Sequence, residues 1–199
     1  MVRAILEGRK TQKRRVIQWP PWTNPAVDGP RLAEDAYALA GEGRRAGLRP
    51  PYGEPGDRLW VRERWCPTAP RGRETSFRLE SALYEADGPM TPPDSRWHSP
   101  IHLPRHLSRI VLEVVDVRVE TLHEISNQDA IAEGLRIPYG DLPGGLAVNE
   151  WFRPGGWARD GHDAPRLVFA DLWDSLNAST GYGWVTNPWV WALTFRRVD

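Results

Sequence analysis

The chain of 199 residues carries 26 acidic and 26 basic side chains, so its formal net charge is zero. Its length fits one domain with a substantial core, and its charge balance excludes the strongly basic surface typical of proteins that bind long duplex DNA. A single cysteine, Cys66, excludes an internal disulfide and a cysteine-cluster zinc site. We find no signal-peptide pattern and no apolar run long enough to cross a bilayer, and therefore expect a cytoplasmic protein without a membrane partner.

The first half of the chain predicts one short helix and several strands. Residues 2–7 have apolar side chains at helical spacing, and Gly8 favours a helix end directly after them. Residues 11–18 are expected to be extended. Residues 58–65 alternate between two sets of side chains and predict a strand, and residues 82–86 predict a shorter one.

The second half predicts two further strands and two helices. Residues 109–120 are rich in branched side chains, which favours a strand. Ser126 is a typical N-cap for a short helix over residues 128–133. Residues 167–176 have apolar side chains at helical spacing, and residues 189–198 predict a closing strand.

This order of elements, with long loops between them, favours an α+β fold. We expect a small, mostly antiparallel β-barrel with short helices packed at its ends. The whole chain, 1–199, is predicted to form one domain with two long loop insertions, at about 23–50 and 136–165, where glycine and proline are frequent.

Lysine use singles out the segment 7–15. Only two of the 26 basic residues are lysines, and both of them, Lys10 and Lys13, lie here. Arginine stays protonated in proteins, whereas a buried or crowded lysine can lose its proton. A solvated basic segment is the ordinary explanation of such a charge run. The choice of lysine favours a site that binds an anion or a polar base, or that transfers protons.

Other polar and aromatic residues are candidates for binding. Glu63 shares the more apolar face of the predicted strand, so it either pairs with an arginine such as Arg15 or orients a lysine. Aromatic rings can stack on a base, although core packing is the commoner role of any one ring. The candidates for stacking are Trp60, Trp65, Tyr84 and Trp97.

Three histidines recur at every fourth position, which on a helix would suit a metal. They are His98, His102 and His106. Pro100 and Pro104 interrupt this stretch and remove the helical spacing, so we predict no metal site and no cofactor. His102 is still expected to face a ligand cleft from its loop.

Four stretches, taken in order, resemble the ASCH domain, a family within the PUA-like barrel superfamily. They are G-R-K-T-Q-K-R from Gly8, G-D-R-L-W-V from Gly56, the strand and D-A-I-A-E-G helix of residues 117–134, and the closing strand from Trp189. The chain also resembles prophage-encoded members of this family, through its first stretch, L-W-V-R-E-R-W from Leu59 and N-P-W-V-W from Asn187.

The resemblance implies a barrel that binds RNA or holds a modified base in a cleft. Some small ASCH proteins are amidohydrolases that remove the acyl group of N4-acetylcytidine with a lysine, a threonine three residues later and a glutamate on the short helix. The matching positions here are Lys10, Lys13 and Glu133, so a lysine replaces the threonine. Thr11 lies two residues too early to take its place.

With this replacement we expect water to be the nucleophile and Glu133 its general base. The two lysines should lower at least one lysine pKa, so that one stabilises the oxyanion and the other protonates the cytosine nitrogen. Direct attack by neutral Lys13 is an alternative, and a salt-bridged helix end is the structural alternative for Glu133. The expected substrate-binding residues are Thr11, Arg15, Trp60, Glu63, Tyr84, Trp97 and His102.

Two other functions compete with hydrolysis of a small nucleoside or nucleobase. The first is a module that binds single-stranded RNA or a modified nucleotide without chemistry, with phosphates on the basic segment and bases on the aromatic rings. The second is a ribonuclease that uses the same lysines and Glu133. An amidohydrolase should act on a free nucleoside almost independently of salt, whereas a binder or nuclease should need a polynucleotide and weaken steeply with salt.

Overall fold

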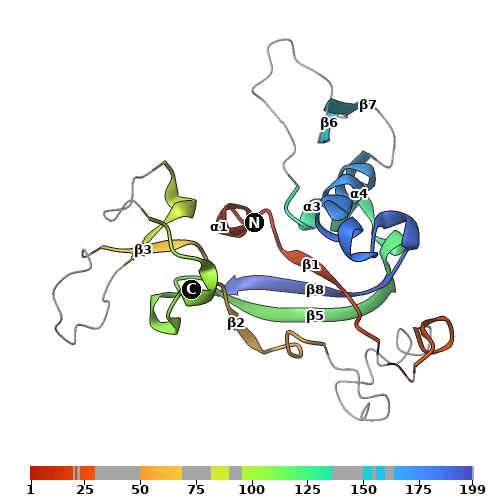
Figure 1. Ribbon diagram of the computed structural model, residues 1–199, viewed down its shortest axis with the longest axis horizontal. Coiled ribbons are helices and arrows are strands. Elements are labelled where there is room, and N and C mark those ends of the chain that lie inside the picture. Colours follow the sequence, from red (N-terminus) through yellow and green to blue (C-terminus); the bar gives the residue numbers. More distant parts are fainter. Residues whose placement is uncertain are drawn as a thin grey trace.

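A four-stranded antiparallel sheet is the main element of the computed structural model (Figure 1). The structure describes residues 1–19, 21, 23–29, 50–68, 82–89, 96–135, 150–153, 156–159 and 164–198. The strand order is β1 (Gln12–Val16), β8 (Trp189–Val198), β5 (Val111–Thr121) and β2 (Arg58–Trp60). The sheet curls into a half-barrel with helices beside it, so the α+β prediction with a barrel-like sheet is confirmed at that level.

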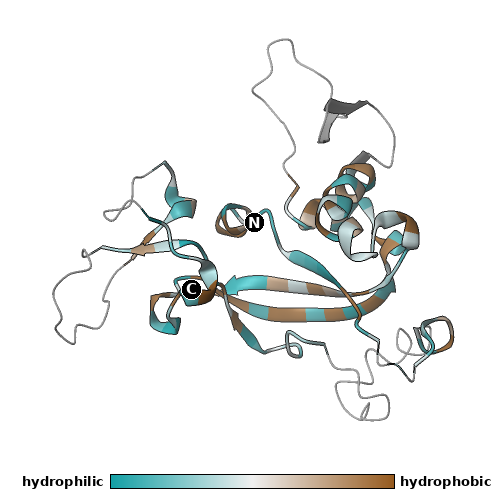
Figure 2. Ribbon diagram, viewed as in Figure 1, coloured by the Kyte–Doolittle hydropathy of each residue, from teal (hydrophilic) through white to brown (hydrophobic). Residues whose placement is uncertain are grey.

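The two long central strands carry the sheet. β5 pairs with β8 from Val111↔Val198 to Thr121↔Trp189, and the register shifts between Val114 and Asp116. Both strands are mainly hydrophobic in Figure 2, and β8 becomes hydrophilic towards its C-terminal end. Branched and aromatic side chains suit a pleated, half-buried surface, which explains why both strands were predictable from the sequence.

One face of the sheet is covered by helices α3 (Asn127–Ala132) and α4 (Ala164–Asn177). Phe169 and Trp173 of α4 share a hydrophobic cluster with Val190 of β8. The predicted N-cap is confirmed, because Ser126 Oγ accepts a hydrogen bond from the backbone N–H of Asp129 at 3.0 Å. The helix predicted over 167–176 is confirmed and is longer at its N-terminal end.

The opposite face holds the N-terminal helix α1 (Val2–Leu6). Ile5 of α1 packs with Ile110, Leu112 and Phe195. Gly8 follows the helix with φ of +72°, a conformation that glycine adopts without a steric penalty. The chain then turns back, because the backbone N–H of Lys10 donates to the carbonyl of Ala4 at 2.9 Å.

The predicted single strand over 58–65 is wrong. β2 ends at Trp60, and β3 (Trp65–Pro67) pairs with β4 (Ala82–Tyr84) in a separate two-stranded sheet. After Val61, whose N–H still donates to the carbonyl of Ile110 at 2.9 Å, the chain leaves β5. The departure places the carboxylate of Glu63 against Arg109 instead of continuing the ladder.

The insertion predicted over 136–165 contains a short hairpin of β6 (Glu150–Arg153) and β7 (Gly156–Arg159). Residues 30–49 of the first insertion and most other residues of the second lie outside the described residues. The short 3-10 helices are η2 (Glu85–Asp87), η3 (Pro100–His102), η4 (Arg105–Leu107), η5 (Leu122–Glu124), η6 (Ala178–Thr180) and η7 (Trp184–Thr186). Within the described ranges, no helix combines the length and hydrophobicity needed to cross a membrane.

Candidate functional site

Strand β1 sends alternate side chains to the two faces of the sheet. Gln12 and Arg14 are buried and register with Thr194 and Ala192 of β8, on the face that α3 covers. Lys13 registers with Leu193, on the face that α1 covers. Because side chains alternate along an extended chain, Gln12 and Arg14 lie on one face of the sheet and Lys13 lies on the other.

Lys10 and Glu133 form a buried ion pair just before β1. The Nζ atom of Lys10 donates to Oε2 of Glu133 at 2.6 Å and to the backbone carbonyl of Glu133 at 2.6 Å. Both residues are 8% exposed. Their backbones form an isolated β-bridge, and the N–H of Thr11 donates to the carbonyl of Ala132 at 2.8 Å. The end of α3 and the start of β1 therefore lock these two side chains together.

Gly134 makes this close approach possible. Its φ is +91°, and an added Cβ atom would lie 2.8 Å from Cβ of Lys10 and 3.1 Å from Cβ of Ala4. Real Cβ atoms essentially never approach another atom as closely as 2.8 Å, so together with the positive φ this contact favours glycine at the end of α3.

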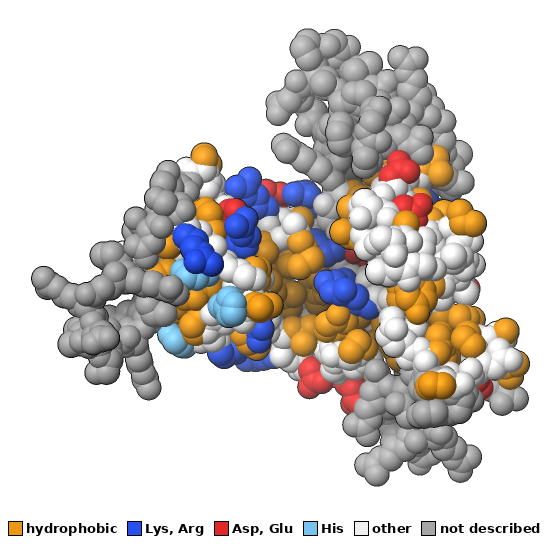
Figure 3. All heavy atoms as spheres, in the orientation of Figure 1, with side chains coloured by type: hydrophobic (Ala, Val, Ile, Leu, Met, Phe, Trp, Pro, Cys, Tyr) orange, Lys and Arg blue, Asp and Glu red, His pale blue; other side chains and the backbone are white. Residues whose placement is uncertain are grey.

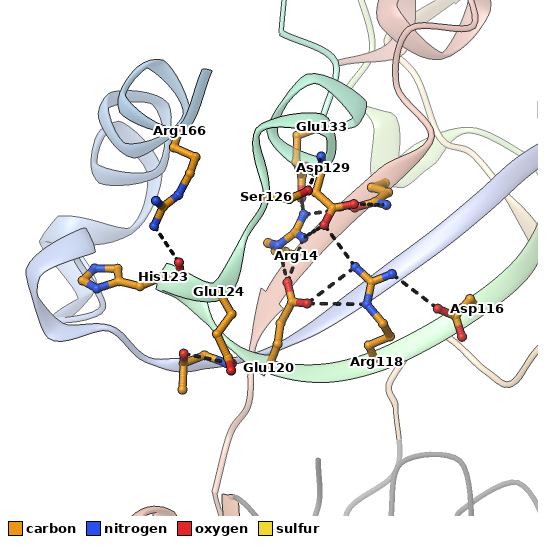
Figure 4. Close-up of polar contacts among 12 residues, drawn as sticks. Arg14, Asp116, Arg118, Glu120, His123, Glu124, Ser126, Asp129, Glu133 and Arg166 are labelled. Carbon is orange, nitrogen blue, oxygen red and sulfur yellow. Dashed lines mark hydrogen bonds and ion pairs between the residues drawn. The ribbon is translucent and has the colours of Figure 1, made fainter. Parts of the chain in front are cut away.

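Arg14 joins Glu133 to a wider network of charges (Figure 4). Its side chain is fully buried and its Nε donates to Oε1 of Glu120 at 2.8 Å. Nη1 lies 3.4 Å from Oε1 of Glu133. Nη2 lies 2.7 Å from Glu120 and 3.4 Å from Asp129; it makes no well-aligned hydrogen bond within the described residues, so these contacts act as ion pairs.

Asp129 is the second branch of the network. Oδ1 of Asp129 accepts from Nε2 of Gln12 at 2.6 Å, and Oδ2 lies 3.4 Å from Arg118. Burial alone would raise the pKa of Asp129, but hydrogen bonds from Gln12 and Ser126 and the charges of Arg14 and Arg118 lower it overall. Asp129 therefore stays ionised and helps to hold Arg14 in place.

Lys13 lies on the other face and has a strongly lowered pKa. Burial is the largest cause, followed by the charges of Arg15 and Lys10, while Glu133 acts in the opposite direction. Together they lower the pKa of Lys13 from 10.5 to about 8. Its Nζ contacts the sulfur of Met1 at 3.8 Å. A lysine with this pKa can exchange a proton with water near neutral pH.

The structure thus brings the three predicted catalytic residues into one electrostatic group. Lys10 and Glu133 are in direct contact, whereas Lys13 interacts with both through its charge. The predicted crowding of the two lysines contributes to the lowered pKa of Lys13, but burial contributes more. Near the centre of the face in Figure 3, a hollow has a hydrophobic wall and Lys or Arg side chains at its rim.

Thr11 and Arg15 flank this group. The carbonyl of Thr11 accepts from the N–H of Phe195 at 2.8 Å, so its backbone ties β1 to β8, and its side chain is exposed. Arg15 is exposed, with its Cζ atom 5.8 Å from the ring centroid of Tyr52. Both residues are accessible to a ligand.

Glu63 and Tyr84 belong to a separate cluster around Arg109. The guanidinium of Arg109 donates to Oε1 and Oε2 of Glu63 at 3.0 and 2.9 Å. Its Cζ atom lies 4.0 Å from the ring centroid of Tyr84, and its Nη2 lies 2.6 Å from Asp87. Glu63 therefore pairs with Arg109, and the predicted partner Arg15 was wrong. The pKa of Tyr84 is raised, chiefly by burial and then by the charge of Glu63.

In the described part of the chain, the remaining predicted ligand contacts form no hydrogen bond or ion pair with Lys10 or Glu133. Trp60 is half-buried on β2, the sheet edge opposite β1. Trp65 packs against His98, with ring centroids 5.2 Å apart. Trp97 is half-buried and His102 is exposed. Among the described residues, no group of three His, Cys, Asp or Glu side chains is arranged to hold a metal ion.

Sequence reasoning missed the residues that hold Glu133 in place. In the sequence, Arg14 is only one member of the basic segment 7–15, and Gln12, Glu120 and Asp129 carry no expected role in the site. A signal was present in one strand, because polar residues at 116, 118 and 120 alternate with valines at 117 and 119. On extended chains, such alternation predicts a polar face opposite an apolar one.

Comparisons of the chain with protein-family models, with curated proteins and with solved structures gave no match.

Proposed function

We propose that this chain is an amidohydrolase of the ASCH, PUA-like type that removes the N4-acyl group of N4-acetylcytidine or a related acylated cytosine. The observation that carries the proposal is the buried contact of Lys10 with Glu133, together with Lys13, whose lowered pKa responds to the charges of both. These are the positions that the resemblance to the family singles out. Hydrolysis of an amide needs a fixed positive group and a group that moves a proton, and this arrangement supplies both.

Lys10 supplies the fixed positive group. Two hydrogen bonds of 2.6 Å to the carboxylate and the carbonyl of Glu133 hold its ammonium in one place. Because the ammonium is already fixed in position, it needs little reorganisation when negative charge develops next to it. In this proposal the third proton of Lys10 stabilises the oxyanion of the tetrahedral intermediate.

Lys13 moves the proton. Its neutral amine takes a proton from water while the water oxygen bonds to the acyl carbon. When the intermediate collapses, the bond from carbon to N4 breaks and the Lys13 ammonium returns the proton to N4. Acid and cytidine leave, and Lys13 is neutral again. A general base works best when its pKa lies near the working pH, and about 8 satisfies that condition.

Glu133 takes a different part from the general base expected from the sequence. Its Oε2 contacts Lys10 at 2.6 Å and its Oε1 lies 3.4 Å from Arg14. Each carboxylate oxygen of Glu133 therefore already faces a cation, which leaves neither oxygen open to take a proton from water. We therefore assign Glu133 to the positioning of Lys10, and Arg14 to the positioning of Glu133.

One observation favours a second candidate function, the binding of a modified base or RNA without chemistry. Lys10 and Glu133 are both 8% exposed and already satisfy each other. In this second function the pair has a purely structural role and joins α3 to β1. Lys13 and Arg15 then supply positive charge that binds the base or RNA.

The test is incubation of the purified protein with N4-acetylcytidine, followed by the loss of its near-ultraviolet absorbance. We expect turnover by the wild type and a fall of at least about 100-fold in Lys13→Met, the size expected for loss of a general base. Glu133→Gln should also lose activity. Glu85→Gln is the matched control, since Glu85 forms an exposed ion pair with Arg64, and it should retain activity.

Absence of turnover by the folded wild type would contradict the amidohydrolase proposal. Titration calorimetry with N4-acetylcytidine would then test the second candidate. Heat of binding that disappears in Arg15→Gln would support a binding module.

A further inference from the structure

A cluster of arginines surrounds one tryptophan at the β2 edge of the sheet. The Cζ atoms of Arg62 and Arg105 lie 4.6 and 5.6 Å from the ring centroid of Trp60. Arg58 lies two residues before Trp60 on the same strand, so both side chains point to the same face. We call Arg58, Trp60, Arg62 and Arg105 the arginine–indole patch.

The three arginines of this patch are exposed and form no ion pair within the described part of the chain. Arg62 donates instead to the carbonyl of Ile101 at 3.1 Å. Arg64, two residues after Arg62, is in contrast paired with Glu85 at 2.7 Å. The carboxylate of Glu113 lies across the strand from Arg58, but Arg196 binds it at 2.8 Å.

Unpaired arginines held on an aromatic ring are prepared to bind an anion. Packing on the indole restricts each guanidinium, so less side-chain entropy is lost when it binds a ligand. Guanidinium groups match the oxygens of phosphate with two parallel hydrogen bonds. The chain as a whole is neutral, so this concentration of positive charge is local rather than a general property of the surface.

We propose that the arginine–indole patch binds the phosphate groups of a single-stranded nucleic acid. Next to the patch, Ile101 is 65% exposed and His102 is exposed, and they offer apolar and flat surface to bases. In Figure 3, Lys and Arg side chains gather with histidines over the left part of the molecule. An acidic peptide would use the charges but has no rings to stack, so nucleic acid is the better fit.

The proposal does not depend on the proposed hydrolysis. The patch lies at the β2 edge of the sheet, whereas Lys10 and Glu133 lie at the β1 edge. Binding at the patch and hydrolysis of a free nucleoside can therefore be measured separately on the same protein.

The experiment measures fluorescence anisotropy of a labelled single-stranded oligouridylate with wild-type protein at several salt concentrations. We expect binding that weakens steeply with salt. The double variant Arg62→Gln/Arg105→Gln should bind at least about tenfold more weakly and lose about 1.4 from the slope of log affinity against log salt, which is two phosphate contacts on a single strand. The control Arg64→Gln removes one paired charge from the same region and should bind within about twofold of wild type.

A second variant, Arg62→Lys/Arg105→Lys, separates loss of the arginine contacts from loss of folding. It keeps both charges and should retain most of the salt slope with weaker affinity, because lysine cannot form the bidentate contact. The proposal is overturned if the wild type does not bind, if the double glutamine variant keeps its affinity and slope, or if polyglutamate displaces the oligonucleotide as well as an unlabelled strand does. Hydrolysis of N4-acetylcytidine should be unchanged in the double glutamine variant, so failure of one proposal is distinguishable from failure of the other.

Discussion

The ammonium of Lys10 lies 2.6 Å from both the carboxylate and the backbone carbonyl of Glu133, and the two residues are 123 positions apart in the chain. One residue therefore holds the lysine twice, once by charge and once by the backbone at the end of α3. A buried cation held in this way is sensitive to every change in its partner, which makes the pair directly testable.

Glu133→Gln should reduce the free energy of unfolding by about 3–5 kcal/mol, because it leaves a buried ammonium without its counter-charge. Urea unfolding followed by tryptophan fluorescence measures this change. The double variant Lys10→Met/Glu133→Gln should be more stable than Glu133→Gln alone, since neither charge remains. Additive losses in Lys10→Met, Glu133→Gln and the double variant would show that the pair is not coupled.

The rate of hydrolysis should rise with pH and become constant above about pH 8, because the proposed base is the neutral form of Lys13. Arg15→Gln removes a neighbouring positive charge that lowers the pKa of Lys13, so the rising limb should move to higher pH. Arg58→Gln, at the far edge of the sheet, is the control and should leave the limb in place. A limb at the same pH in Arg15→Gln would contradict the assignment to Lys13.

Stability should also depend on pH through Lys13. The folded pKa is about 8 and the ordinary value is 10.5, so between these values the unfolded chain binds more protons than the folded one. The contribution of Lys13 to stability therefore rises as pH increases from about 8 to 10.5, and below pH 8 its burial is a net cost. Lys13→Met should be more stable than wild type at pH 7, and the difference should shrink towards pH 10.5. The measurement is the unfolding free energy of both proteins at four pH values. A difference between Lys13→Met and wild type that does not change with pH would contradict the prediction.

Gly134→Ala should damage both stability and activity. Its φ is +91°, and the new methyl group would lie 2.8 Å from Cβ of Lys10. Gly181→Ala is the matched control, with φ of +85° and no atom within 4 Å of the added Cβ. Both should lose about 1 kcal/mol from the left-handed conformation, and Gly134→Ala should lose more and hydrolyse more slowly because Lys10 is displaced. Equal stability and equal activity of the two variants would refute the steric argument.

Glu63→Gln should cost about 1.5–3 kcal/mol of unfolding free energy. Glu63 is 1% exposed and accepts two hydrogen bonds from Arg109, so the change weakens two charge-assisted hydrogen bonds, while Arg109 keeps its ion pair with Asp87. Glu85→Gln breaks the exposed pair with Arg64 and should cost less than about 1 kcal/mol. Both values come from urea unfolding, and similar costs for the two variants would contradict the difference in burial.

Local patterns predicted most of the elements around the site. The apolar spacing of residues 2–7 predicted α1, Ser126 predicted the start of α3, and the branched residues after 109 predicted β5. Each of these signals depends on neighbours within a few positions along the chain. The prediction of one strand over 58–65 failed because the chain leaves β5 after Val61, and Glu63 forms an ion pair with Arg109, which lies 46 positions away in the sequence.

By itself, the sequence determined the α+β class, the two central strands and the concentration of lysine in one segment, since composition and periodicity are properties of the chain alone. Only the tertiary structure decided which charges meet. Arg14 contacts Glu120 and Glu133, at separations of 106 and 119 residues, and no local rule connects such positions. The lowered pKa of Lys13 likewise arises chiefly from burial, and the removal of water from a side chain depends on everything that packs around it.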